Sequence, residues 1–339
     1  MEVFNPNSNI NFLGLRKVSL AVSVLLVILS IGAIVTRGLN YGLDFTGGLL
    51  VEASYEQPID VGDVRAALEA GGFEHAVVQS IGGAREVSIR LQISDTTPAA
   101  DAAKTDAAPS APATKADAND DASRNRGDKA AAAVLKALQA KRHDVTIKPS
   151  AFVGSTVGDE LKSDGVTAVI FVIIGIMIYI GIRFEWRFAV AAIASEIHDT
   201  LITVGFYAIT QHEFDITVLA SVLAVVGYSI NDKVVVFDRV RELFRSARRA
   251  EPEEILNKAI NSTLSRTIIT ALFTAITMVA LYFFGGPVVH GFALTMLIGI
   301  VVGTLSSIFF ASPILLWLGV SKKDLMPVTR DNPELARRP

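Results

Sequence analysis

Six apolar windows constrain this chain of 339 residues more than any other feature of its sequence. A helix needs about 20 mostly apolar residues to cross the hydrocarbon core of a membrane. The windows that meet this requirement are 17–36, 164–183, 187–210, 215–237, 264–284 and 291–319. The first window is longer than the apolar core of a cleavable signal peptide, which has about 7–15 residues. We therefore predict a polytopic α-helical membrane protein with six transmembrane helices.

Lysine and arginine residues lie beside alternate ends of these windows. They occur in residues 1–16, between the second and third windows, in the loop 238–263 and in the tail 320–339, whereas the loops "QHEFD" and "GGPVVHG" carry none. An excess of Lys and Arg marks the cytoplasmic loops of membrane proteins. The asymmetry therefore predicts that both termini are cytoplasmic and that the long segment 37–163 faces away from the cytoplasm.

The segment 37–163 is long enough to hold a folded domain outside the membrane. Within it, residues 94–128 contain no aromatic residue and no Leu, Ile or Val. Such a stretch cannot bury enough apolar surface to offset its chain entropy, so we predict a disordered insert. The remaining pattern has the order β-α-β-β-α-β, which is the ferredoxin-like arrangement. We therefore predict an α+β ferredoxin-like domain between the first and second transmembrane helices.

The composition and the motifs exclude several classes of function. A net charge of −3 provides no broad basic field, so we expect no nucleic-acid partner. The chain has no cysteine, which removes thiolate catalysis and cysteine-based metal sites. It also has no phosphate-binding loop, no G-x-S-x-G motif and no histidine set at metal-binding spacing. We expect no enzymatic activity, no metal and no cofactor.

The third window carries ionisable residues near mid-depth, about twelve residues from Arg187. Glu196 and Asp199 share one helix face with Ala192 and Thr203, and His198 lies on a neighbouring face. Ionisable side chains inside a membrane are energetically expensive and mark ion pathways or proton relays. We therefore treat these three ionisable residues as candidates for a proton relay.

Asp232 lies within the fourth window, five residues before the apolar run ends at Phe237. Arg266 in the fifth window lies at a similar depth, so we predict that the two side chains face each other. The long stem of Lys233 predicts that its ammonium group reaches the cytoplasmic interface. The Asp232–Arg266 pair is either a static brace or part of a proton path, and the ionisable residues of the third window favour the path.

Two further periodic patterns occur in the last two windows. A hydroxyl stripe shares one helix face with Arg266, and its members are Thr263, Thr270, Thr274 and Thr277. We predict that this stripe lines a hydrated or proton-carrying path. Small residues recur at every fourth position of the sixth window, at Gly291, Thr295, Gly299, Gly303, Ser307 and Ala311. That spacing predicts close packing against another helix.

Four motifs, in order along the chain, resemble the SecD/SecF family of protein-export membrane proteins, and specifically its SecF members. They are "YGLDFTGG", "EIHDTLITVGF", "GYSINDKVVVFDRVRE" and "SRTIITALFT". The resemblance covers nearly the whole chain. It implies half of the architecture of a resistance–nodulation–division transporter, located in the bacterial inner membrane with the ferredoxin-like domain in the periplasm.

The resemblance also assigns roles to individual residues. The "ND" pair of the fourth window falls on Asn231 and Asp232, the arginine of the fifth on Arg266, and the "HD" pair on His198 and Asp199. The "LDFTGG" motif places four residues where the chain leaves the membrane, namely Asp44, Thr46, Gly47 and Gly48. Two features depart from the family pattern: Lys233, where a small or hydroxyl residue is expected, and the long insert 94–128.

The resemblance implies partners and a driving force. A SecD protein, the SecYEG channel, the SecA ATPase and a translocating preprotein are the implied partners, with the YajC and YidC proteins as further candidates. The implied function is to use the proton-motive force, with protons as the coupling ion, to complete export after SecA has acted. Two alternatives remain open: a half-size small-molecule exporter of the same superfamily, and a passive assembly scaffold. An intramembrane aspartyl protease is disfavoured because "GYSIND" lacks the G-x-G-D motif of such enzymes.

Overall fold

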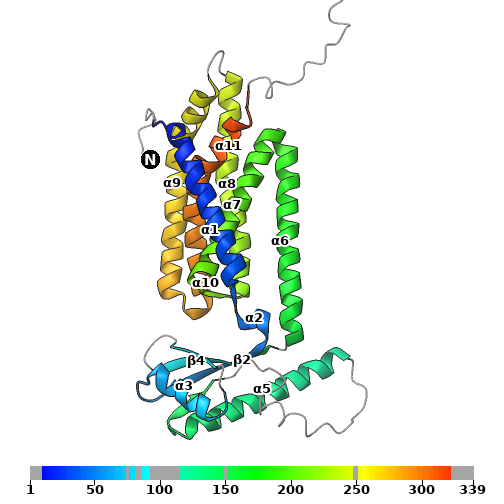
Figure 1. Ribbon diagram of the computed structural model, residues 1–339, viewed down its shortest axis with the longest axis vertical. Coiled ribbons are helices and arrows are strands. Elements are labelled where there is room, and N and C mark those ends of the chain that lie inside the picture. Colours follow the sequence, from blue (N-terminus) through cyan, green and yellow to red (C-terminus); the bar gives the residue numbers. More distant parts are fainter. Residues whose placement is uncertain are drawn as a thin grey trace, which may run out of the picture.

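The protein is described by a computed structural model that covers residues 10–73, 76–80, 85–91, 115–148, 151–153, 155–246 and 251–321. Within these residues, six helices are long and apolar enough to cross a membrane, which confirms the predicted number of spans. Figure 1 shows them as an elongated bundle with a small sheet domain at one end.

The six spans are built from eight helical segments. Five spans are single α-helices, namely α1 (Arg16–Arg37), α6 (Ser155–Arg183), α7 (Trp186–Thr210), α8 (Ile216–Ser246) and α9 (Pro252–Phe284). The sixth consists of α10 (Pro287–Ser306), the π-helical turn η2 (Ser307–Ala311) and α11 (Ser312–Trp317). A short 3₁₀ turn, η1 (Leu13–Leu15), precedes α1.

Three helices extend well beyond their predicted spans. Most of the loop predicted at 238–263 is helical, because α8 continues to Ser246 and α9 begins at Pro252. Proline at the first helical position and the acidic residues Glu253 and Glu254 in the first turn both favour a helix start there. Helix α6 likewise begins at Ser155, before the predicted start of the second span.

The sheet domain lies between α1 and α6 in the chain. Its elements are β2 (Gly48–Tyr55), α3 (Val61–Ala70), β3 (Val77–Ser80), β4 (Glu86–Leu91), α5 (Lys115–Gln139), β5 (Val145–Ile147) and β6 (Ala151–Val153). The strand order β3-β4-β2-β5, with every pair antiparallel, agrees with the predicted ferredoxin-like arrangement. The predicted fourth strand is split into β5 and β6, which both pair with β2.

The core of the sheet domain follows from the period of each element. On β2, Leu49, Val51 and Ala53 alternate with less buried residues and point to one face. Helices α3 and α5 cover that face, and Val134 and Leu138 of α5 are buried at helical spacing. The domain therefore has an apolar core of its own, separate from the membrane bundle.

The prediction of disorder across 94–128 is wrong for its second half. Residues 94–114 lie outside the described part of the chain, but α5 begins at Lys115. Its first half, residues 115–127, has three alanines but equally many aspartates together with Asn119, Asn125 and Gly127, so local propensity favours a helix there only weakly. A helix anchored by the buried stripe near Val134 can still extend toward its N-terminus turn by turn, because propagation costs less than nucleation.

Small residues bring α10 close to α8, as their spacing predicted. A Cβ atom on Gly291 would lie 2.9 Å from Val218, one on Gly299 would overlap Val225, and one on Gly303 would lie 2.7 Å from the Ser229 hydroxyl. Side chains larger than hydrogen at these positions would separate the two helices. This close approach places the end of α10 beside the polar residues of α8.

Candidate functional site

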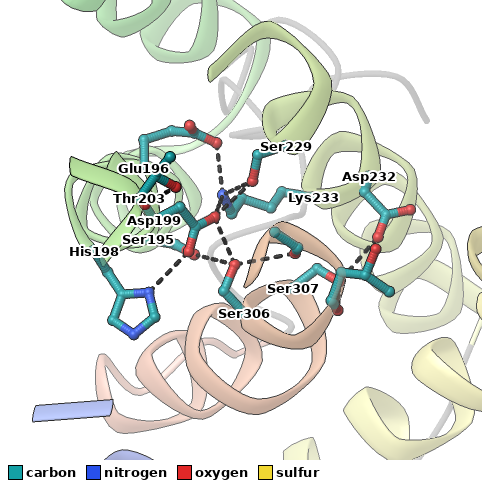
Figure 2. Close-up of polar contacts among 12 residues, drawn as sticks. Ser195, Glu196, His198, Asp199, Thr203, Ser229, Asp232, Lys233, Ser306 and Ser307 are labelled. Atoms are coloured by element: carbon teal, nitrogen blue, oxygen red, sulfur yellow. Dashed lines mark hydrogen bonds and ion pairs between the residues drawn. The ribbon is translucent and has the colours of Figure 1, made fainter. Parts of the chain in front are cut away.

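Asp232 lies on α8 where that helix meets α9 and the π-helical turn. Its Oδ1 accepts a hydrogen bond from Thr267 Oγ1 (2.8 Å), and its Oδ2 accepts one from Ser307 Oγ (3.0 Å). Figure 2 shows this carboxylate on a different face of α8 from Lys233. Asp232 is thus partly buried and held by neutral hydroxyl groups from two other helices.

The predicted pairing of Asp232 with Arg266 is wrong. Adjacent residues on a helix point about 100° apart, and α9 turns Thr267 rather than Arg266 toward Asp232. Thr267 is 3% exposed, whereas the Arg266 side chain lies exposed on the outer surface of α9. Asn231 is exposed on α8 as well. The bundle therefore brings Asp232 to hydroxyl groups and leaves Arg266 on its surface.

The prediction that the Lys233 ammonium group reaches the cytoplasmic interface is wrong. Its side chain is fully buried in the bundle. Its Nζ donates to Glu196 Oε1 (2.6 Å), Asp199 Oδ2 (2.7 Å) and Ser229 Oγ (2.7 Å). A buried ammonium group is tolerated only where acceptors replace its hydration, and these three oxygens do so. Lys233 therefore joins α8 to the ionisable residues of α7 (Figure 2).

Asp199 accepts more hydrogen bonds than either carboxylate near it. Its Oδ2 accepts from Lys233, from Ser229 Oγ (2.6 Å) and from Ser306 Oγ (2.7 Å). Its Oδ1 lies 2.8 Å from His198 Nδ1. The predicted helix face on α7 is confirmed as inward-facing, since Asp199 is 1% exposed and Thr203 is fully buried.

His198 lies beside the cluster on the neighbouring face, as predicted. Its ring stacks on Phe310 of the π-helical turn, with ring centroids 4.1 Å apart and planes at 21°. Its Nε2 is buried and has no hydrogen-bond partner among the described residues. The π-helical turn therefore contacts this cluster through a ring and the Asp232 carboxylate through Ser307.

The hydroxyl groups of the predicted threonine stripe bond to their own helix. Thr263, Thr270, Thr274 and Thr277 each donate to a backbone carbonyl three or four residues earlier. Thr270 and Thr274 also lie beside the Tyr228 hydroxyl of α8, whereas Thr277 is exposed. The stripe therefore lies partly between α8 and α9 and partly on the outer surface.

The junction motif connects the sheet domain to the start of α8. Asp44 lies on the single turn α2 (Leu43–Thr46), and its Oδ2 accepts a hydrogen bond from the backbone N–H of Ile216 (3.1 Å). Thr46 donates to the carbonyl of Gly42 (3.1 Å). Gly47 and Gly48 have φ angles of +70° and +145°, which favour glycine. The motif therefore has a structural role at the exit of α1.

Strands and an ion pair strengthen this junction. The short strands β1 (Asn40–Tyr41) and β7 (Glu213–Phe214) pair in parallel beside α2. Arg90 of β4 forms an ion pair with Glu213 of β7, so the sheet domain is tied to the turn between α7 and α8. The sheet domain is therefore connected to the turn that precedes α8 by an ion pair, in addition to the chain itself.

Sequence reasoning missed four hydroxyl residues of the site, Ser229, Thr267, Ser306 and Ser307, and the inward position of Lys233. A weak signal existed, since Ser229 and Lys233 are four residues apart and therefore lie on one helix face. The adjacent serines and Thr267 had no such signal, because single hydroxyl residues are common in membrane helices.

Comparison with known proteins places this arrangement in a family. Residues 133–321 match the family described as protein export membrane protein SecD/SecF, C-terminal, and residues 32–59 match the SecD/SecF GG motif. The chain belongs to the SecD/SecF family. The motif match contains the junction residues Asp44 to Gly48, and the longer match contains every residue of the two carboxylate clusters.

Relatives in the SecD/SecF family align over almost the whole chain. The protein translocase subunit SecF of Pseudomonas aeruginosa is 42% identical, with 94% of each chain covered. That of Vibrio alginolyticus is 39% identical over 96% of this chain and 95% of its own. The crystal structure of SecDF from Thermus thermophilus matches with a TM-score of 0.74 and 33% identity, covering 93% of this chain. This chain spans 39% of that SecDF chain.

Proposed function

We propose that this chain is a SecF-type subunit of the bacterial protein translocase. In this proposal it pairs with a SecD-type partner and uses the proton-motive force to complete export through the SecYEG channel after SecA has acted. YajC and YidC proteins are further candidate partners. The names of the relatives support the role as a translocase subunit. The observation that carries the proton role is the environment of Asp232.

Asp232 is surrounded by groups that can bind either form of a carboxyl group. The hydroxyls of Thr267 and Ser307 donate to the carboxylate, and a hydroxyl can rotate to accept from the protonated acid. An arginine partner could only donate, and it would hold the carboxylate ionised. Asp232 can therefore gain and lose a proton without breaking an ion pair, as a proton-driven subunit requires.

The position of Arg266 supports a membrane partner. Its side chain is exposed on the outer surface of α9, within a segment apolar enough to cross a membrane. An arginine that faces lipid costs about 2.5–3.5 kcal/mol at the bilayer centre and less near the cytoplasmic end of a span, where Arg266 lies and can reach toward the interface. A second membrane subunit that covers this face with an acceptor would remove the cost. This chain matches 39% of the Thermus SecDF chain, so the other 61% of that chain (100% − 39%) lies outside the match and is long enough to contain such a partner.

The proposed location is the inner membrane, with both termini in the cytoplasm and the sheet domain in the periplasm. Figure 1 places the sheet domain at the end of the bundle where α1 ends and α6 begins. A reporter fused after Gly285 should therefore be active only outside the cytoplasm, and one fused after Arg249 only inside. The opposite result at either position would reject this orientation.

The proton role is tested by Asp232→Asn, which keeps the shape and hydrogen bonds of the side chain but cannot release a proton. Late-stage translocation into inverted vesicles is measured with and without a proton gradient, at matched protein levels and with a SecD partner. We expect SecA-driven, ATP-dependent export to continue and the gradient-stimulated part to disappear.

Asp238→Asn is the matched control, since Asp238 lies on the same helix and forms a half-exposed ion pair with Arg183 (2.8 Å). It should keep gradient-stimulated export. Wild-type stimulation in Asp232→Asn would show that this residue is a structural brace and would remove the basis of the proton proposal.

A further inference from the structure

The cluster around Lys233 contains more negative than positive groups. Two carboxyl groups, Glu196 and Asp199, bond to a single ammonium group, and all three side chains are at least nine-tenths buried. If both carboxyl groups were ionised and His198 neutral, the cluster would carry a buried charge of about −1 with nothing to compensate it. One additional proton must therefore reside in the cluster.

The count of hydrogen-bond donors shows which group holds that proton. Asp199 accepts from Lys233, Ser229 and Ser306, and its second oxygen contacts His198 Nδ1. Glu196 accepts from Lys233 through Oε1 and has the Ser229 hydroxyl as a further neighbour, but its Oε2 is buried without a partner among the described residues. An ionised carboxyl needs donors at both oxygens, so Asp199 fits the ionised form and Glu196 the protonated one.

The alternative location for the proton is His198, which would then be an imidazolium ion. Its Nε2 is buried and without a partner in the described residues, so the added N–H would have no acceptor. Glu196 would at the same time remain an ionised carboxylate whose Oε2 accepts no hydrogen bond from the described residues. A neutral His198 that donates from Nδ1 to Asp199, beside a neutral Glu196, leaves no buried charge uncompensated.

An apolar crevice between α6 and α7 leads to Glu196. Its volume is about 170 Å³, and Glu196 lines its wall. The other lining residues are Ile173, Ile176, Met177, Ile193, Ile197, Thr200, Leu201 and Val226. An engineered apolar cavity of about 150 Å³ in another protein admits benzene, so a ring of that size fits here. Figure 1 shows α6 along one side of the bundle.

We propose that Glu196 is a proton-binding site that carries a proton while Asp199 and Lys233 remain ionised, and that it exchanges this proton through the crevice between α6 and α7. The charged groups that act on it are Lys233 from α8 and Asp199 from α7, while His198 contacts Asp199 and Phe310 instead; from α6 the crevice is lined by apolar side chains. The inference extends the proposed proton-driven function by adding a second exchange site, separate from Asp232.

Infrared spectroscopy of the purified full chain in lipid tests the protonation. We expect a carboxylic-acid C=O band at neutral pH that Glu196→Gln removes and that Asp232→Asn leaves in place. Lys233→Met removes the positive charge, so a second carboxylic-acid band from Asp199 should appear. If Lys233→Met does not fold, the comparison of wild type with Glu196→Gln still decides. An unchanged acid band in Glu196→Gln would overturn the proposal.

Dicyclohexylcarbodiimide, an apolar reagent, tests the route. A protonated carboxyl group adds to it: the acid proton moves to a nitrogen, the carboxyl oxygen bonds to the central carbon, and acyl transfer to nitrogen gives a stable N-acylurea. Mass spectrometry should find this adduct on Glu196 in the wild type and in Asp232→Asn.

Met177→Trp serves as the matched variant, because it fills the crevice without touching the charged groups. It should slow labelling of Glu196 several-fold and leave the acid band unchanged. Labelling at the wild-type rate in Met177→Trp would exclude the crevice as the route. Neither measurement needs a partner subunit or a preprotein, so failure here is distinct from loss of gradient-driven export.

Discussion

Ser306 and Ser307 are adjacent in the chain, yet their hydroxyl groups donate to carboxylates on two different helices. Ser306 Oγ bonds to Asp199 of α7 (2.7 Å), and Ser307 Oγ bonds to Asp232 of α8 (3.0 Å). The π-helical turn begins at Ser307. Turns of this kind are rare in proteins, and those that occur often lie at functional sites. The sixth span therefore contacts both carboxylate clusters at one point, through the last residue of α10 and the first residue of the turn.

Ser307→Ala should weaken the gradient-driven step of export. The change removes one of two hydroxyl donors to Asp232, and a hydrogen bond to a charged group contributes about 1.5–3 kcal/mol. We expect gradient-stimulated translocation to fall about tenfold or more, with ATP-dependent export unchanged. Thr277→Val is the control, because the Thr277 hydroxyl donates to its own helix at Phe273. Equal effects of the two changes would contradict a specific role for Ser307.

Gly303→Ala should destabilise the bundle. The new methyl group would lie 2.7 Å from Ser229 Oγ and 3.0 Å from its Cβ, so α10 must move away from α8. Overpacking of this kind costs about 1–3 kcal/mol. Heating in detergent followed by size-exclusion chromatography should show a lower midpoint of unfolding. Gly227→Ala on α8 has nothing within 4 Å of the new atom and should leave the midpoint unchanged or slightly raised.

The Arg90–Glu213 ion pair should couple the sheet domain to the bundle. Arg90→Glu places two like charges together, whereas the exchanged variant Arg90→Glu with Glu213→Arg restores attraction. For a partly exposed pair we expect an interaction of about 1 kcal/mol in a double-mutant cycle. Hydrogen exchange of the amides in β1 and β7 is the measurement. We expect Arg90→Glu to speed hydrogen exchange and the charge-swapped double variant to restore the slow rate. If the double variant exchanges as fast as Arg90→Glu, the ion pair does not couple the two parts.

Tyr55 should make the stability of the sheet domain fall at high pH. Its side chain is 4% exposed, and burial raises its pKa to about 12. In the unfolded chain the pKa is about 10, so the unfolded state loses the proton first as the pH rises. The stability that Tyr55 contributes is fully present below about pH 10 and is lost as the pH rises toward 12, by at most about 3 kcal/mol. Tyr55→Phe should remove this part of the slope in thermal unfolding; an unchanged slope would show that other groups cause it.

The sequence alone determined the number of spans, the order of elements in the sheet domain and the presence of ionisable groups inside the membrane. Length, period and composition suffice for these, because each is a property of a local stretch of chain. The apolar residues that flank Glu196, Asp199 and Asp232 are thus enough to assign them to membrane helices. The half of the insert that forms α5 has no such local signal, since its helix depends on anchoring by packed residues such as Val134.

The tertiary structure decided which side chains meet. Arg266 and Thr267 are adjacent, and only the packing of α9 against α8 turns the threonine toward Asp232. Asp232 and Lys233 are adjacent as well, and their different directions create two separate clusters. A rotation of about 100° about one helix axis exchanges such neighbours. That rotation is set by side-chain packing over the whole bundle, including the close contacts of Gly299 and Gly303, and no local pattern in the sequence encodes it.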